Sequence, residues 1–203
     1  FYQLKIMLVK IMERTITKTL AQTLEDLKNV SADFNTVVEN LFEFRFEDYN
    51  QVFKINELDV PAKTYKRFPV FNNENAVAIL MLWGAENKTA IHDHKNYEGK
   101  IKVLKGELTE VYYKETKDFI EYEGAGVAIE GISFAEEMGG IHSIVNNKPT
   151  LSVSLHIYKT NQLNLSGVRI FDLEHKKWAV LNDKAPSCTW NLPEEAFEKI
   201  YQL

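Results

Sequence analysis

The chain has 203 residues with 24 basic and 29 acidic side chains, a net charge of −5 and a sequence pI near 5.6. Its 45% hydrophobic and 26% charged content is typical of a soluble globular protein with one full core. The acidic balance and the lack of a basic stripe argue against a nucleic-acid partner, and no run approaches the ~20 apolar residues that span a membrane. We therefore expect a small diffusible substrate.

The first residues do not resemble a targeting segment. Residues 1–12 are apolar, but lysines interrupt them every few positions, and no small-residue cleavage site follows. Met7 and Met12 are both candidate start residues, which leaves open whether the residues before Met12 are native.

The next part of the chain is predicted to be a helical annex over about residues 13–62. Apolar side chains recur at helical spacing over residues 15–30. A second helix is expected after a cap at Ser31 or Asp33, and a short helix or turn is expected at 56–61. The second helix has an apolar stripe that consists of Phe34, Val37, Val38 and Leu41.

From residue 65 the chain changes to short apolar runs broken by Gly, Asn and Asp, which predicts an all-β body over about residues 65–175. Candidate strands are 77–83, 89–94, 100–104, 108–114, 119–122, 126–129, 134–138, 142–146, 151–158 and 168–172. Closely spaced strands after helices favour a small antiparallel barrel or a double-sheet jelly roll.

Residues 176–203 are interpreted as a C-terminal extension of the same single domain. They contain Cys188, the only cysteine, so no internal disulfide is possible and a reducing cytoplasm is expected. A structural thiol is favoured over a catalytic nucleophile there.

Three of the five histidines predict a metal centre. His92 and His94 alternate on an extended segment, so both imidazoles project to one face, and His142 follows 48 residues after His94. A third imidazole from a neighbouring strand would complete a three-nitrogen site with open positions. Such a site suits zinc as well as non-haem iron, and the ligand count alone does not separate them.

The spacing around these histidines resembles the two motifs of the cupin superfamily, whose jelly-roll barrel holds a metal in its mouth. Gly106 follows twelve residues after His94, and Gly139 to Asn146 supplies Gly-x-x-His-x-x-x-Asn. Cupins often add a glutamate ligand, but strand alternation places Gly99 inward with Ile101 and Val103 and places Glu98 in solvent.

Further segments resemble the cysteine dioxygenase type I (thiol dioxygenase) family. They are Ala90-Ile91-His92-Asp93-His94, Val103-Leu104-Lys105-Gly106-Glu107-Leu108, Gly140-Ile141-His142 and Ser152-Val153-Ser154-Leu155-His156-Ile157-Tyr158. Tyr65-Lys66-Arg67 fits that family's substrate-binding Tyr-x-Arg. The resemblance extends from about Val37 to Phe171.

The resemblance implies Fe(II) held by His92, His94 and His142, and oxidation of a thiol amino acid by O₂ to a sulfinate. Arg67 would bind the substrate carboxylate, with Tyr65 on the same face of an extended segment. The residues that would form a hydrogen-bond relay beside the iron are Ser154, His156 and Tyr158. L-Cysteine is the expected substrate, and the enzyme is expected to work as a cytoplasmic monomer.

Two departures from the family pattern matter. Animal members have a cysteine at the position of Gly99 that crosslinks to the tyrosine matching Tyr158, so no thioether cofactor is expected here. The prolines that often follow that tyrosine are replaced by Lys159-Thr160-Asn161. Two alternatives stay open: a dioxygenase for another small thiol such as 3-mercaptopropionate, and a non-catalytic metal-binding cupin.

Overall fold

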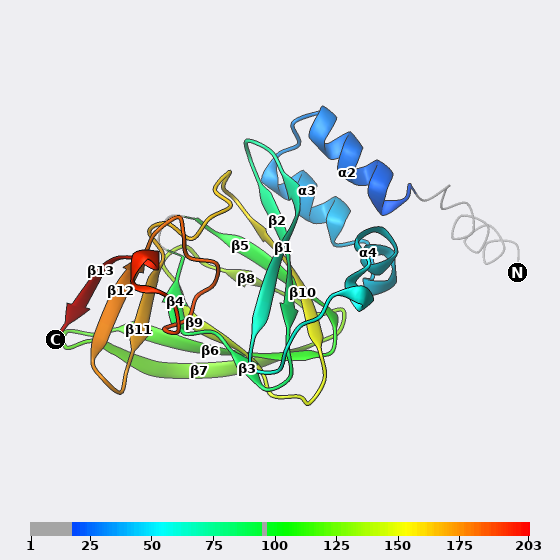
Figure 1. Cartoon of the computed structure of the whole chain (residues 1–203). Coiled ribbons are helices and arrows are strands. Elements are labelled where there is room, and N and C mark those ends of the chain that lie inside the picture. Colours follow the sequence, from blue (N-terminus) through cyan, green and yellow to red (C-terminus); the bar gives the residue numbers. More distant parts are fainter. Residues whose placement is uncertain (1–17, 95–96) are drawn as a thin grey trace, which may run out of the picture.

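The computed structural model describes residues 18–94 and 97–203 and begins with three helices (Figure 1). They are α2 (Leu20–Asn29), α3 (Phe34–Leu41) and α4 (Phe46–Phe53), followed by the 3₁₀ helix η1 (Ile55–Glu57). Helix α2 begins at Leu20 because Thr19 and Gln22 form a capping box. The start of the first helix expected at residue 15 and the two candidate start methionines lie outside the described residues.

Helix α3 has the expected cap and stripe. Asp33 accepts a hydrogen bond from the backbone N–H of Thr36, and all four residues of the apolar stripe are buried. The sequence reading did not predict α4. Its N-cap is Arg45, which lacks the short polar side chain that usually marks a helix start, and Asp48 accepts from the Arg45 backbone N–H instead.

The β strands form two sheets. The five-stranded sheet has the order β1 (Tyr65–Asn72), β2 (Val77–Trp83), β10 (Ser152–Tyr158), β5 (Gly99–Lys105) and β8 (Ser133–Glu136). The eight-stranded sheet has the order β13 (Phe197–Gln202), β12 (Lys177–Leu181), β11 (Arg169–Asp172), β4 (Ile91–Asp93), β9 (Ile141–Asn146), β6 (Glu107–Glu115) and β7 (Ile120–Ile129), with β3 (Asn87–Lys88) paired to β9. All these pairs are antiparallel.

Several strand boundaries correct the prediction. The two strands expected at 119–122 and 126–129 are one strand, β7. Its pairing with β6 continues through Gly124, with a register shift next to that residue. The segment expected as one strand at 89–94 is shorter and follows the two-residue β3. Strands β1, β12 and β13 were not predicted, and the last two join the C-terminal extension to the eight-stranded sheet.

The prediction of a mainly β, jelly-roll type body preceded by helices is confirmed. The sheets enclose an apolar interior to which both contribute, but their hydrogen bonds do not close them into one barrel. Figure 1 shows β6 and β7 as a long hairpin, with β11–β13 at one end of the molecule and the helices at the other.

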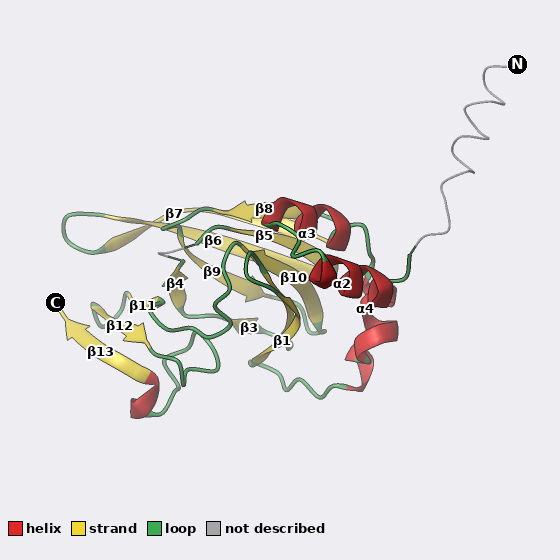
Figure 2. Ribbon diagram, turned by 90° about the horizontal axis from the view of Figure 1, so that it is seen from above, coloured by secondary structure: helices red, strands yellow, loops and turns green. Residues whose placement is uncertain are grey.

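The helices cover the outer face of the five-stranded sheet (Figure 2). A second apolar cluster fills this helix–sheet contact, so β2 and β10 are buried along their whole length. Each of these strands therefore has one face toward the helices and one toward the interior. No helix in the described part of the chain is long and apolar enough to cross a lipid bilayer.

Candidate metal centre and substrate cavity

The structure brings the three predicted histidines together. Strand β4 carries His92 and leads into His94, and β9 places His142 directly opposite His92 in the ladder. One ligand atom from each imidazole lies within 4.8 Å of the other two, and the Nε2 atoms of His94 and His142 are 3.2 Å apart. All three side chains are buried, so the cluster is an interior site.

Hydrogen bonds turn two of these imidazoles toward a common point. Nδ1 of His92 donates to the carbonyl of Ala90 at 3.0 Å, and Nδ1 of His142 donates to the carboxylate of Glu110 at 2.6 Å. With Nδ1 protonated, Nε2 keeps a free lone pair, which is the form that binds a metal. Glu110 was not predicted; it lies on β6, adjacent to β9.

Burial keeps two of the three imidazoles neutral. Burial, followed by the neighbouring His142, lowers the pKa of His92 to about 3, and burial also holds the pKa of His94 well below its usual range. Burial lowers the pKa of His142 too, but the carboxylates of Glu136 and Glu110 outweigh it and raise this pKa overall. Two neutral imidazoles and a third supported by carboxylates form a donor set that fits a divalent transition metal.

Glu136 is a site residue that the sequence reading missed. It lies at the end of β8, is 5% exposed, and neither carboxylate oxygen has a hydrogen-bond partner in the described structure. Oε1 is 3.4 Å from Nε2 of His142, and Oε2 is 3.6 Å from Nε2 of His94. A carboxyl group thus lies beside the imidazole nitrogens, although the inward-facing residue at the start of β5 is Gly99.

Strand alternation correctly predicted that Gly99 faces the interior and that Glu98 faces solvent. Gly99 faces inward against the ring of Tyr158, and Glu98 is exposed and pairs with Lys159 at 2.9 Å. A Cβ atom on Gly99 would lie 2.6 Å from Cδ1 of Tyr158. The tyrosine ring therefore fills the space that a side chain at this position would need.

Ser154, His156 and Tyr158 form one hydrogen-bonded chain along the inner face of β10. Nε1 of Trp83 donates to Oγ of Ser154 at 2.8 Å, and this Oγ is 2.9 Å from Nε2 of His156. Nδ1 of His156 is 2.9 Å from the hydroxyl of Tyr158.

Trp83 defines one end of this chain. Its indole can only donate, so Oγ of Ser154 accepts from it, and the Ser154 hydroxyl is able to donate to Nε2 of His156. In that arrangement Nδ1 of His156 donates to the oxygen of Tyr158, and the Tyr158 hydroxyl proton faces the carboxyl group of Glu136. Burial lowers the pKa of His156, which keeps this imidazole neutral.

Arg67 and Tyr65 lie in the wall of the same cavity as the histidines. The cavity residues are Tyr65, Arg67, Met81, Trp83, Thr89, His92, His94, Tyr97, Glu136, Ile144, His156, Tyr158, Leu165 and Cys188. Nη2 of Arg67 donates to the carbonyl of Leu163 at 3.0 Å. Tyr65 stacks on Trp83, with ring centroids 5.2 Å apart, and its hydroxyl accepts from the backbone N–H of Cys188.

Two further cavity residues were not expected. Tyr97 packs against the rings of His94 and Tyr158, and Cys188 reaches the cavity from the C-terminal extension. Burial raises the pKa of the Cys188 thiol to about 12, so it stays a neutral thiol.

A buried ion pair anchors the segment that carries the first two histidines. Asp93, which is fully buried, accepts hydrogen bonds from the backbone N–H of Arg169 at 3.0 Å and from its Nε at 2.6 Å. Arg169 also pairs with Glu115 at 2.7 Å. The ion pair ties β4 to β11 on the side of the strand that faces away from the metal cluster.

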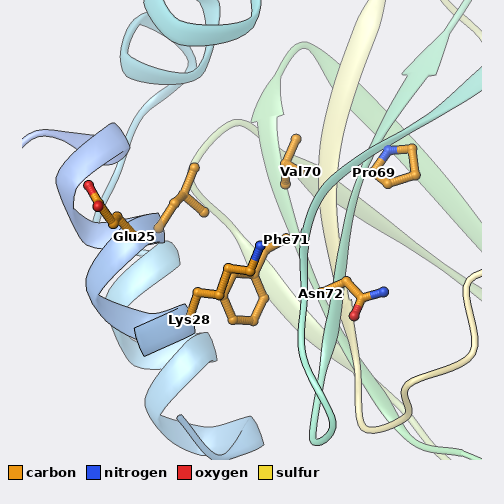
Figure 3. Close-up of a pocket in the computed structure, with 7 residues that line it drawn as sticks. Glu25, Lys28, Pro69, Val70, Phe71 and Asn72 are labelled. Atoms are coloured by element: carbon orange, nitrogen blue, oxygen red, sulfur yellow. The ribbon is translucent and has the colours of Figure 1, made fainter. Parts of the chain in front are cut away.

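A separate groove of about 630 Å³ lies between α2 and β1 (Figure 3). Its lining residues are Leu24, Glu25, Lys28, Pro69, Val70, Phe71 and Asn72. It contains no histidine or cysteine and is distinct from the cavity with the metal cluster, so the chemistry belongs to the latter.

The sequence matches the family model for cysteine dioxygenase type I over residues 7–173. Solved structures with weak similarity include TT1209 from Thermus thermophilus, at 15% identity over 52% of this chain and 91% of that chain, with a TM-score of 0.43. Another is the cupin domain of Cnp3 from Schizosaccharomyces pombe, at 16% identity over 52% of this chain and 71% of that chain, with a TM-score of 0.42.

The family match alone carries the assignment. It covers far more than half of the chain, and it includes both strands that supply the histidines and the strand that carries the hydrogen-bonded chain. The protein therefore belongs to the cysteine dioxygenase type I family and is a dioxygenase.

Proposed function

We propose that this protein oxidises L-cysteine with O₂ to cysteine sulfinate, using Fe(II) held by His92, His94 and His142. The observation that supports this most is the presence of Arg67 in the wall of the cavity that contains the three imidazoles. A metal site alone has no need of a guanidinium, whereas an amino-acid thiol has a carboxylate to bind.

The reaction joins one thiolate and one dioxygen molecule, RS⁻ + O₂ → RSO₂⁻. Both oxygen atoms end on sulfur, which loses four electrons to them. Bound Fe(II) would supply positions for the thiolate and for dioxygen, and its positive charge would favour the thiolate over the thiol. The protein residues then have to hold the rest of the substrate and control protons near the sulfur.

Arg67 is proposed to bind the substrate carboxylate. A guanidinium offers parallel N–H donors that match a carboxylate, and one of its nitrogens is already fixed by the carbonyl of Leu163. A charge-assisted hydrogen bond is worth roughly 1.5–3 kcal/mol, which corresponds to a change of about tenfold to a hundredfold in binding.

Tyr158 is proposed to present a proton to the bound substrate or oxygen. The chain from Trp83 through Ser154 and His156 is able to supply a donor to the tyrosine oxygen, which directs the hydroxyl proton into the cavity, where Glu136 lies. Burial raises the pKa of Tyr158, so the phenol stays protonated. No thioether to Gly99 is involved, because glycine has no sulfur.

The test is anaerobic reconstitution of the protein with Fe(II), followed by oxygen uptake and sulfinate detection. We expect turnover with cysteine, a KM for cysteine raised roughly tenfold to a hundredfold in Arg67→Ala, and no retained iron in His92→Ala. Lys66→Ala, which removes an exposed neighbouring cation, is the matched control and should behave like the native protein.

Each alternative has its own result. Faster turnover of 3-mercaptopropionate or cysteamine than of cysteine would assign another thiol. Iron retention and thiol binding without sulfinate would indicate a non-catalytic cupin. An unchanged KM in Arg67→Ala would remove this residue from the substrate site.

A further inference from the structure

The carboxyl group of Glu136 is buried beside the imidazole nitrogens of the metal centre. It is 5% exposed, and both of its oxygens lack a hydrogen bond in the described structure. A buried carboxylate is stabilised by a positive group close to it. The imidazole of His142 and the hydroxyl of Tyr158 favour the carboxylate form of Glu136, and burial outweighs them.

The groups closest to it are nitrogens that face the metal position. Oε1 lies 3.4 Å from Nε2 of His142 and 3.9 Å from Nδ1 of His156, and Oε2 lies 3.6 Å from Nε2 of His94. Nδ1 of His142 donates to Glu110, so in the neutral imidazole Nε2 offers a lone pair. An oxygen and a nitrogen lone pair that face each other at this distance are stabilised by a cation between them.

The spacing agrees with a shared ion. Ligand atoms about 2.1 Å from one ion lie roughly 3.0–3.4 Å apart when they are adjacent in a tetrahedral or octahedral arrangement. The Nε2 atoms of His94 and His142 are 3.2 Å apart. Their distances to the nearest oxygen of Glu136 are 3.6 Å for His94 and 3.4 Å for His142. We propose that Glu136 is a fourth protein ligand of the metal, an inference that depends on the proposed three-histidine centre.

Gly99 makes room for this carboxylate. Gly99 and Glu136 are partners in the ladder between β5 and β8, and a Cβ atom on Gly99 would lie 3.2 Å from Oε2 of Glu136. The carboxylate therefore reaches the centre from β8 across a position on β5 that has no side chain. An anionic ligand there lowers the net charge of the centre by one.

The test is titration of the metal-free protein with Co(II), followed by visible absorption, which responds to coordination number and geometry. Glu136→Gln keeps the shape of the side chain and removes its charge, and Glu137→Gln changes the exposed neighbour as the matched control. We expect at least tenfold weaker Co(II) binding and an altered spectrum in Glu136→Gln, and no change in the control. Thermal unfolding of the metal-free variants should show Glu136→Gln as stable as the native protein or more so.

The outcomes separate this inference from the metal centre itself. Co(II) affinity within twofold of native and the same spectrum in Glu136→Gln would overturn the fourth ligand. A loss of stability in metal-free Glu136→Gln with unchanged affinity would do the same, because it would assign a structural role. His142→Ala tests the centre, since unchanged Co(II) binding in that variant would refute the three-histidine site.

Discussion

Adding one methyl group at position 99 should destabilise the protein, although the change from glycine to alanine usually does the opposite. In Gly99→Ala the new Cβ atom would lie 2.6 Å from Cδ1 and 2.9 Å from Cε1 of Tyr158, both well inside van der Waals contact. Gly99 is the ladder partner of Tyr158, and both residues face the packed interior, so the ring cannot retreat without moving its neighbours. Overpacking of this kind costs about 1–3 kcal/mol.

The assay is urea unfolding of the metal-free protein, with the free energy of unfolding compared at an unchanged m-value. Gly124→Ala is the matched control because a Cβ atom there has open space within 4 Å, so we expect no loss of stability. Equal stability of the two variants would refute the reasoning, since it would mean that the Tyr158 ring yields at no cost. The same reasoning predicts that Gly99→Cys forms no thioether unless the ring moves.

Three further perturbations test the support of the metal centre. Glu110→Gln should weaken metal binding about tenfold to a hundredfold, because the carboxylate that orients His142 becomes a neutral amide; Co(II) titration measures this. Asp93→Asn should lower the free energy of unfolding by about 2–4 kcal/mol, because it breaks a buried pair with Arg169 that Glu115 only partly replaces; urea unfolding measures this. Removing the metal with a chelator should lower the unfolding temperature of the native protein but not of His92→Ala, as calorimetry would show.

The parts of the site that depend on strand alternation could be predicted from the sequence. Two histidines separated by one residue must share a face, and so must Ser154, His156 and Tyr158. The same rule separated Gly99 from Glu98, and the structure agrees. These predictions succeed because the side-chain period of a strand is a local property.

The residues that were missed depend on register between strands that are distant in sequence. Glu110 meets His142 because β6 pairs with β9, and Glu136 meets Gly99 because β8 pairs with β5. No local pattern specifies which residue of one strand faces which residue of another. A signal was present in retrospect: Glu136 is an acidic residue in a predicted strand, and its partner position was already assigned to the interior.

The C-terminal part shows a different limit. Strand β12 (Lys177–Leu181) was missed although it is as long as some strands that were predicted. Strand β13 was missed because charged and polar residues interrupt the apolar ones in Phe197–Gln202. Cys188 could not be placed in the cavity wall from a sequence in which it is isolated. Cys188 lies in the segment that follows β12. Its backbone N–H donates a hydrogen bond to the hydroxyl of Tyr65, which holds this segment against the cavity wall.

The helical annex and the active cavity both contact strand β10, which links their stabilities. The inner face of β10 carries the hydrogen-bonded chain of Ser154, His156 and Tyr158. Its outer face packs into the helix–sheet cluster through Val153, Leu155 and Ile157. Any loss of helix packing would leave three aliphatic side chains of this strand exposed to water, at a cost of about 1.5–3 kcal/mol for each one. Because the distances in the relay are set by the backbone of β10, the helices contribute to the geometry of the site without touching it.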